Sequence, residues 1–424
     1  MVTALERSTR RDPLQLLAVL ARRKGDCFVY TTGQPQSFLV NRPEWVRHVL
    51  VDRHAFYSKD TPINSGFDTT IASALLTSEG DVWRRQRTLV QPFFSRRRGP
   101  AFAGVVCETF DHMSREWDAA AARGEPIDFS FAMSQLTFRV TAAALFHADT
   151  SEWDSRLVHI LTDALPVLTD ESKEPFRIAQ VVLHELTSRL VEERLAAPVL
   201  DDLFGALRTA GTDDGSKRGL LDHVKTMLLA GYETTASVIT WASYLLATHA
   251  SRMAELRTHI DSVIGDRPLT HQDLPSLPLL TAVVKETMRL YPPAWIIGRR
   301  ALEPDRIGDT DIPAQSVVAI SPYTLHRHTR YWSDPETFDP HRFLDEEAER
   351  KHEAFAYIPF GAGPRTCIGS NLALVEAPLV IGRLLQRYRL TLENTEPVHP
   401  RGIFVLVPHV PITMRLSRRS LRNG

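Results

Sequence analysis

The stretch Phe360-Gly-Ala-Gly-Pro-Arg-Thr-Cys-Ile-Gly369 places one cysteine among glycines, directly before a helical pattern from about Ser370 to Tyr388. A glycine-rich turn lets backbone approach a large flat ligand. Backbone N–H groups at a helix start, together with the helix dipole, stabilise a thiolate over a thiol. A thiolate bound to iron donates electron density that favours O–O cleavage. Cys367 is therefore a candidate iron ligand, although the run also fits a buried structural cysteine beside an ordinary turn.

Other uses of these glycines and cysteines fit the sequence poorly. A dinucleotide-binding loop needs a third glycine where Thr366 stands, and the Gly-Lys-Ser/Thr of a phosphate-binding loop is missing. The three cysteines, Cys27, Cys107 and Cys367, are far apart, which argues against a disulfide framework, a redox pair and a cysteine-rich zinc site. Such cysteine usage fits a reducing compartment.

The composition of the 424-residue chain is that of an ordinary globular protein, with 43% hydrophobic and 24% charged residues. Its net charge of −1 gives no global field that would attract nucleic acid or an anionic membrane. The apolar run Leu14–Ala21 is followed by Arg22-Arg23-Lys24 and is far shorter than the ~20 residues that span a bilayer. We expect a short amphipathic helix there, no membrane anchor, and a soluble, cytoplasmic protein.

The residue patterns predict a mainly α protein with a small β-region. Apolar residues recur at three- and four-residue spacing through much of the region from about Pro43 to Pro293. Strand-rich parts are expected at about 27–40, 295–320 and 403–416, with helices in the remainder. Because strands lie at both ends, we expect residues 1–424 to form a single domain in which the two ends pair.

The stretch Ala230-Gly-Tyr-Glu-Thr-Thr235 lies within a helical run from about Leu220 to Thr248. Gly231 and consecutive threonines are poor mid-helix residues, and they are tolerated where a Thr hydroxyl bonds the i−4 carbonyl at a local bulge. Such a bulge makes room for O₂ and water, and Glu233 and Thr234 are an acid and an alcohol that can relay protons. The alternative is a kinked core helix with a surface Glu233.

Glu286 and Arg289 stand at i and i+3 on a helix that Tyr291-Pro-Pro293 ends. As an exposed pair they would contribute under ~1 kcal/mol to stability. With Arg342 in Pro340-His-Arg-Phe343, they are instead expected to hold the Pro-rich segment against the helix. This role is structural and supports the scaffold of the cysteine loop.

Trp83 and Arg87 are one helical turn apart and so share a helix face. An indole N–H and a guanidinium on one face are able to bind one carboxylate, such as a haem propionate, and Arg365 is a further candidate for such a contact. The alternative is a packed Trp83 beside a surface Arg87.

Taken together, these motifs resemble those of the cytochrome P-450 family of haem-thiolate monooxygenases, over essentially the whole chain. Five motifs match in order and spacing: Trp83-x-x-x-Arg87, Ala230-Gly231-x-Glu233-Thr234-Thr235, Glu286-x-x-Arg289, Pro340-x-Arg342-Phe343 and Phe360-x-x-Gly363-x-Arg365-x-Cys367-x-Gly369. The resemblance implies a triangular, mostly helical prism with haem b buried between two long helices. It implies Cys367 as the iron ligand and Glu233 and Thr234 in proton delivery.

The same resemblance implies the remaining site residues. Around the cofactor it places Trp83, Arg87, Arg299, Phe360, Arg365 and Gly369, with Arg300 as a close rival of Arg299. Substrate contacts are implied from about Ser58–Leu76 and Leu161–Val181, and from Ala230, Trp295, Ile296 and Phe404.

The reaction implied is O₂-dependent oxidation of a lipophilic small molecule, of terpenoid, polyketide or fatty-acyl type, in bacterial secondary metabolism. Because no reductase domain is fused, electrons would come from a separate ferredoxin or flavodoxin with its NAD(P)H reductase, and the protein is expected to be a monomer. Arg96-Arg97-Arg98 is either a docking patch for that partner or a solvated charge run. Two alternatives stay open, oxidative coupling or peroxygenase chemistry on the same haem, and a non-catalytic haem-binding sensor.

Overall fold

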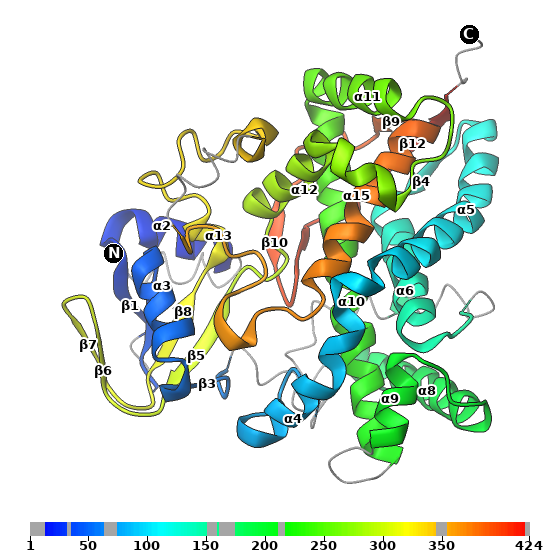
Figure 1. The fold of residues 1–424 in the computed structure, drawn as a ribbon. Helices are drawn as coiled ribbons and strands as arrows, with labels where there is room; N and C mark the ends of the chain where they lie inside the picture. Colours follow the sequence, from blue (N-terminus) through cyan, green and yellow to red (C-terminus); the bar gives the residue numbers. More distant parts are fainter. Residues whose placement is uncertain are drawn as a thin grey trace. The chain divides into compact units, whose positions relative to one another are not determined.

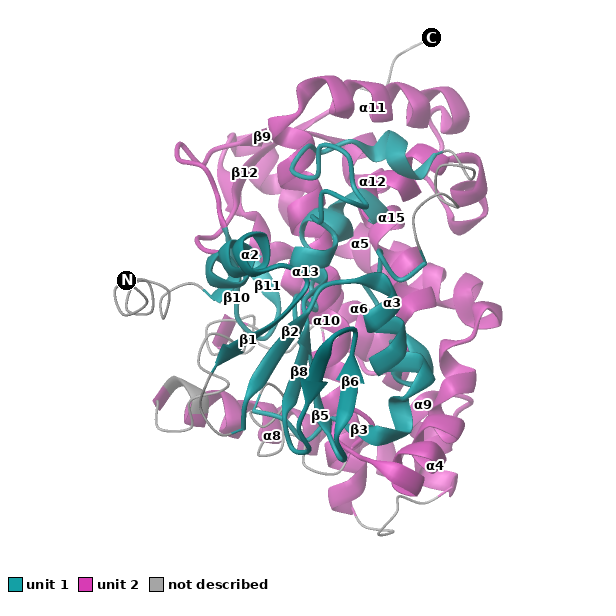
Figure 2. Cartoon of the chain, turned by 90° about the vertical axis from the view of Figure 1, so that its left-hand side faces the viewer, with its two compact units in different colours: residues 1–66, 285–367, 400–407 teal, residues 67–284, 368–399, 408–424 magenta. Residues whose placement is uncertain are grey.

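The computed structural model describes residues 13–31, 35–62, 74–150, 159–160, 174–210, 217–344 and 354–419. The chain is mainly α-helical with a small β-region, as predicted from the sequence (Figure 1). It divides into two compact units, shown in teal and magenta in Figure 2. Unit 1 consists of Met1–Gly66, Lys285–Cys367 and Pro400–Val407, and unit 2 consists of Phe67–Val284, Ile368–His399 and Pro408–Gly424. Each unit is therefore assembled from segments that are distant in sequence.

Unit 1 is built around a five-stranded sheet with the strand order β1-β2-β8-β5-β3. The pair β2–β8 is parallel, and the pairs β1–β2, β5–β8 and β3–β5 are antiparallel. A two-stranded hairpin, β6–β7, lies between β5 and β8 in sequence. The elements of unit 1 are α2 (Pro13–Lys24), β1 (Cys27–Thr31), β2 (Ser37–Val40), α3 (Pro43–Arg47), β3 (Tyr57–Ser58), β5 (Ile297–Ala301), β6 (Asp305–Ile307), β7 (Thr310–Ile312), β8 (Val317–Ile320), α13 (Pro322–Leu325), β10 (Pro400–Gly402) and β11 (Leu406–Pro408).

The core of unit 1 lies on this sheet and holds the start of the cysteine loop. Val318 and Ile320 of β8, which is buried at every position, pack in one cluster with Ile358. Val49 and Leu50 join the same cluster from a π-helical turn, His48–Asp52. Each fully buried Val, Leu or Ile contributes about 1.5–3 kcal/mol of hydrophobic stabilisation. Ile358 therefore anchors the chain two residues before the cysteine run begins.

Unit 2 is helical, and its centre is the packing of α6 against the 32-residue α10. Asp128 caps α6 by accepting the Phe131 N–H at 2.9 Å. This satisfies one of the N–H groups that the first turn of a helix leaves without a partner. The helices of unit 2 are α4 (Gly80–Val90), α5 (Gly99–Arg123), α6 (Phe129–Phe146), α8 (Glu174–Ala196), α9 (Leu203–Ala210), α10 (Lys217–Thr248), α11 (Ala250–Ile264) and α15 (Ser370–Arg387), and α12 (Pro278–Leu290) runs from unit 2 into unit 1.

The C-terminal strands are arranged differently from the sequence-based expectation. The pattern predicted strand from residue 403, but the structure has strands at Pro400–Gly402 (β10) and Leu406–Pro408 (β11), with the turn at Ile403–Val405 between them. The last strand, β12 (Thr413–Arg418), pairs with β4 (Pro126–Asp128) and β9 (Tyr388–Leu392) in unit 2. Val405 is buried without being in a strand, so apolar residues alone gave a misleading pattern there.

Among the helices in the described part of the chain, none is both long and apolar enough to cross a lipid bilayer.

Candidate functional site

The cysteine loop belongs to unit 1 and is a tight, hydrogen-bonded turn. The Cys367 N–H donates to the Phe360 carbonyl at 2.9 Å, which closes the loop at its base. Gly361 and Gly363 have φ of +70° and +71°, a region that side chains disfavour. A Cβ on Gly363 would lie 1.9 Å from the Leu50 carbonyl oxygen of the π-helical turn. Both glycines are thus required by backbone conformation, and Gly363 also by close packing.

Cys367 differs from the other two cysteines in its surroundings. It is exposed, whereas Cys27 and Cys107 are half-buried. Burial raises the pKa of the Cys27 and Cys107 thiols, which keeps them protonated at neutral pH. The interpretation of Cys367 as a buried structural cysteine is therefore wrong, and it is the most exposed of the three cysteines.

Two arginines of unit 1 were candidates for carboxylate contacts from β5. Arg299 is 8% exposed, and its Nη1 donates to the Gly298 carbonyl at 2.8 Å. Arg300 instead turns to the loop after β3, where its Nε donates to the Asp60 carbonyl at 2.5 Å and lies 3.4 Å from the Asp60 carboxylate. The two arginines therefore have different partners, and the choice of Arg299 over Arg300 as a propionate contact stays a prediction. Arg365 ends the short 3₁₀ turn Gly363–Arg365 and is half-buried.

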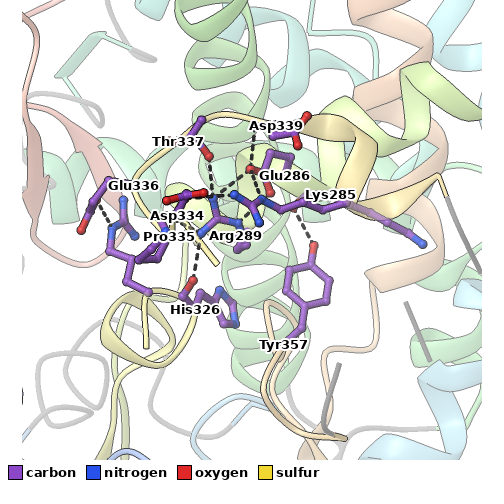
Figure 3. A network of polar contacts seen from close by, with 12 residues as sticks. Lys285, Glu286, Arg289, His326, Asp334, Pro335, Glu336, Thr337, Asp339 and Tyr357 are labelled. Carbon is purple, nitrogen blue, oxygen red and sulfur yellow. Dashed lines mark hydrogen bonds and ion pairs between the residues drawn. The ribbon is translucent and has the colours of Figure 1, made fainter. Parts of the chain in front are cut away.

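Glu286 and Arg289 lie in a buried polar network (Figure 3), which Arg342 joins through Glu286. The side chains of Glu286 and Arg289 are 0% exposed and form a two-pronged ion pair at 2.6 and 2.8 Å. Arg342 lies 3.5 Å from Glu286 Oε1, and the Asp339 N–H donates to the same oxygen at 2.9 Å. Arg289 also donates to three backbone carbonyls, those of His326, Pro335 and Thr337. Because both side chains are buried, Glu286 and Arg289 are not a weakly held surface pair. Their network joins α12 to the Pro-rich segment.

Glu233 of unit 2 is buried inside the contact between α10 and α6. It is 4% exposed, and the Ser134 hydroxyl of α6 donates to its Oε2 at 3.4 Å. Burial raises the pKa of Glu233 to about 7, and the hydrogen bond from Ser134 opposes that rise. The alternative of a surface glutamate is wrong. A carboxyl group with this pKa is able to hold or release a proton near neutral pH.

Thr234 makes the hydroxyl-to-carbonyl hydrogen bond that the sequence predicted, to Ala230 at 2.9 Å. The predicted bulge is not seen, because α10 is a continuous α-helix from Lys217 to Thr248. Close packing against α6 explains the glycine at position 231, because a Cβ there would lie 2.8 Å from Thr141 Cγ2. The glycine therefore permits close helix packing and does not mark a break in the helix.

One stripe of α10 is more accessible than the rest of its central part. Ala230, Gly231 and Thr234 are half-buried, while the neighbouring residues from Leu228 to Ser243 are buried. Positions 230 and 234 are one turn apart on the same face. Ala230 and Thr234, a candidate substrate contact and a candidate catalytic residue, thus share this stripe.

Trp83 and Arg87 lie on α4 and are both half-buried, with Gln86 and Val90 buried beside them. Both candidates therefore sit at the boundary between the buried and exposed parts of α4. The basic run after α4 is a 3₁₀ turn, Arg96–Arg98, and its last arginine is already paired with Asp201 at 2.8 Å.

The remaining substrate candidates belong to unit 1. The Trp295 indole N–H donates to the Ile403 carbonyl at 2.7 Å, which fixes the residues after α12 to the turn that carries Phe404. Ile296 and Phe404 are half-buried and Trp295 is buried. Most of the expected contact segments Ser58–Leu76 and Leu161–Val181 lies outside the described residues, which omit 63–73 and 161–173.

Two contributors to the site were missed by sequence reasoning. Ser134, which hydrogen-bonds Glu233, is one of several small polar residues in α6 and carried no recognisable signal. The Leu50 carbonyl, which packs on Gly363, belongs to the backbone and was invisible to any residue pattern. In the sequence, only Gly363 itself indicated that something packs closely against the loop.

Cys367 on its glycine-dependent loop, the buried Glu233 beside Thr234 and the buried Glu286–Arg289 pair fit the haem-thiolate class of proteins that the sequence motifs resemble. The family model "Cytochrome P450" matches residues 1–415, so the chain belongs to the cytochrome P-450 family and is a cytochrome P-450 monooxygenase.

Three bacterial relatives have related sequences over most of their length. Cyclooctatin synthase of Streptomyces melanosporofaciens is 34% identical over 92% of this chain and 88% of its own length. Cyclooctat-9-en-7-ol 5-monooxygenase of the same organism is 31% identical over 90% of this chain and 85% of its own length. Pentalenene oxygenase of Streptomyces avermitilis is 28% identical over 97% of this chain and 94% of its own length.

The family implies a haem-iron cofactor, and the residues of the cysteine loop fit such a group. A thiol must ionise and be reachable to bind iron, and Cys367 is the exposed one of the three. The two left-handed glycines bring the backbone around it into a turn with little side-chain bulk.

Proposed function

We propose that this enzyme uses O₂ and external electrons to oxidise a lipophilic small molecule of terpenoid, polyketide or fatty-acyl type, with Cys367 as the thiolate ligand of haem b. The exposed Cys367 on its closed loop carries the proposal. Bound at this cysteine, the haem supplies the binding and reductive activation of O₂. The protein's own residues hold it, exclude water and manage protons.

In this proposal the cofactor is held by the motif residues. Cys367 binds the iron, and Arg299 and Arg365 bind the propionates through charge-assisted hydrogen bonds. Trp83 and Arg87 are proposed to add an indole N–H and a further guanidinium from one face of α4. Phe360 and Gly369 border the loop, and Gly369 leads directly into α15.

Proton delivery is proposed for Glu233 and Thr234. The pKa of Glu233, about 7, lets its carboxyl take up a proton and give it back near neutral pH. The Thr234 hydroxyl donates to the Ala230 carbonyl, so its oxygen remains an acceptor for a further proton donor. This acid–alcohol pair favours reductive O₂ activation over direct use of peroxide.

The substrate class is supported by the apolar candidates and by the relatives. Ile296, Phe404 and Ala230 are apolar and half-buried, so each offers uncharged, partly accessible surface. Two of the relatives are named for cyclooctat-9-en-7-ol and pentalenene, names that denote uncharged, unsaturated molecules. A role in bacterial secondary metabolism is proposed on the same basis. A panel of cyclic hydrocarbons, macrolides and fatty acids, screened for a substrate-induced spin-state shift, would rank the three classes.

Electrons are proposed to come from a separate ferredoxin or flavodoxin with its NAD(P)H reductase. Arg96 and Arg97 are the candidate docking charges, since Arg98 is already paired with Asp201. Exchanging Arg96 and Arg97 for Gln should slow reduction by an acidic partner at low salt, with a smaller difference at high salt. An unchanged rate at low salt would remove the patch from the proposal.

The central test is the absorption spectrum of the reduced CO complex. Cys367→Ser should abolish the red-shifted band that a thiolate ligand produces, while the matched variant Cys107→Ser should keep it. The proposal fails if the band survives in Cys367→Ser. Turnover driven by peroxide alone and unaffected by Thr234→Ala would favour peroxygenase chemistry instead.

A further inference from the structure

His326 occupies a buried position between the Glu286–Arg289 network and the start of the cysteine loop. It follows α13 directly and is 0% exposed. Its backbone carbonyl accepts a hydrogen bond from Arg289 Nη1 at 3.0 Å, as Figure 3 shows. A histidine ring this deeply buried is expected to be neutral, because an uncompensated charge there would be strongly disfavoured.

The ring of His326 acts as a hydrogen-bond acceptor. The Ile358 N–H lies 2.9 Å from Nε2, and a backbone N–H can only donate. Nε2 is therefore unprotonated and the neutral ring carries its proton on Nδ1. Burial, followed by the charges of Arg289 and Arg327, lowers the pKa of His326 to about 3. Hydrogen bonds with the backbone of Arg289 and Met288 raise the pKa of His326, but by less than burial and the two charges lower it.

Ile358 connects this ring to the cysteine by a series of short backbone hydrogen bonds. Its carbonyl accepts the Gly361 N–H at 3.0 Å, and the Phe360 carbonyl accepts the Cys367 N–H at 2.9 Å. Each bond closes a turn, so the position of the Ile358 amide helps to set the position of the thiol. Ile358 itself is 4% exposed, which leaves its N–H no access to water if His326 is removed.

A second contact ties the same segment to the same helix. The Tyr357 hydroxyl donates to the Lys285 carbonyl at 2.8 Å, and its ring lies 5.1 Å from the His326 ring, centroid to centroid. Figure 3 shows both side chains below Arg289, with Tyr357 reaching up to α12. Residues 357 and 358 are therefore fixed together, one through a side chain and one through its backbone.

We propose that His326 is a positioning residue for the cysteine loop, whose neutral ring accepts the Ile358 N–H and thereby fixes the loop to the Glu286–Arg289 network. This inference rests on the proposed role of Cys367 as the iron ligand. Arg289 thus holds the backbone of His326, and the ring of His326 holds the Ile358 N–H at the start of the loop. Loss of the ring acceptor loosens Ile358–Cys367 and exposes the thiolate to protonation or loss of iron.

The test compares variants that differ in where they offer an acceptor. The Gln carbonyl oxygen can occupy the place of Nε2, whereas the Asn side chain reaches only as far as Nδ1. His326→Gln should therefore retain the stable red-shifted band of the reduced CO complex, and His326→Asn and His326→Leu should convert to the unshifted form about tenfold faster, as expected for one lost buried hydrogen bond. His328→Asn removes a histidine contact two residues away, that of Nε2 with Asp26 at 2.9 Å, and should leave the conversion rate close to that of the wild type.

A second measurement does not depend on the cofactor. Hydrogen exchange of the peptide containing Ile358, in protein without haem, should be about tenfold faster in His326→Asn than in His326→Gln. Equal rates in the Gln and Asn variants, by both measurements, would overturn the inference, and so would equally fast conversion in His328→Asn. If His326→Leu does not fold, the Gln and Asn pair still decides. Failure of this inference leaves Cys367→Ser as the separate test of the ligand assignment.

Discussion

Replacing Arg289 with Lys tests the buried network most directly, because the arginine uses all of its hydrogen-bonding capacity. A guanidinium has five N–H donors. Two of these bind Glu286, at 2.6 and 2.8 Å, and three bind the backbone carbonyls of His326, Pro335 and Thr337, at 3.0, 2.6 and 3.0 Å. The guanidinium carbon also lies 5.2 Å from the Trp332 ring.

The expected loss of stability follows from this count. A lysine ammonium has three donors, so at least two buried acceptors lose their partners. Each unsatisfied buried acceptor costs about 1–3 kcal/mol, which gives a total of about 2–6 kcal/mol. Measured losses on breaking buried ion pairs are about 3–5 kcal/mol. Because lysine keeps the charge that Glu286 needs, we expect a loss of about 4 kcal/mol in the free energy of unfolding.

The assay is urea denaturation, followed in parallel by tryptophan fluorescence and far-UV circular dichroism. The loss is read from the shift in midpoint at constant m-value, provided that the two transitions coincide. Arg189→Lys is the matched control, because Arg189 pairs with Glu193 at i,i+4 with side chains 59% and 55% exposed. The control should change stability by under about 0.5 kcal/mol. A loss below about 1 kcal/mol in Arg289→Lys would refute the argument that every donor is needed.

Three further predictions concern unit 2. Because burial raises the pKa of Glu233 from 4.5 to about 7, the folded state binds more protons than the unfolded state between these values. Stability should therefore fall by about 3 kcal/mol as pH rises from 4.5 to 7, and Glu233→Gln should remove that slope in urea titrations at several pH values. Burial raises the pKa of Glu376 as well, so infrared spectroscopy at neutral pH should detect protonated carboxyl absorption that is weaker in Glu376→Gln. Gly231→Ala should cost about 1–3 kcal/mol despite the better helix propensity of Ala, since its Cβ would lie 2.8 Å from Thr141 Cγ2, and adding Thr141→Ser should restore part of the loss in thermal unfolding.

Each of these predictions has an outcome that contradicts it. A pH slope that persists in Glu233→Gln would assign the titration to another group. An infrared band that is unchanged in Glu376→Gln would mean that Glu376 is ionised. A gain of stability in Gly231→Ala would show that α6 and α10 have room for a side chain at this position.

Much of the local structure could be predicted because it depends on neighbouring residues. Strands β1 and β2 lie within the strand-rich part predicted at about 27–40, and the predicted helix after Cys367 begins at Ser370 as observed. Alternating or helical apolar patterns report directly on which face of such an element is buried. The pattern failed at Ile403–Val405, where burial comes from tertiary packing of a turn.

The candidate site was predictable only in part, for the same reason. Glu233, Thr234 and Cys367 were recognisable as groups able to do chemistry, because motif spacing fixes which side chains share a turn or a loop. Whether Glu233 was a surface residue or a buried acid stayed open until Ser134 of α6, 99 residues earlier in the chain, was found beside it. A residue's pKa depends on the solvent and charges around it, and those are set by the fold.

The sequence by itself therefore predicted the family, most of the local elements and Cys367 as the candidate iron ligand. Only the tertiary structure decided that Gly231 serves helix packing, that Gly363 makes room for the Leu50 carbonyl, and that Glu286 is shared by Arg289 and Arg342. It also decided that the ring of His326 supports the loop. The physical reason is that covalent spacing fixes contacts within a few residues, whereas burial and hydrogen bonding across tens to hundreds of residues arise when the segments pack.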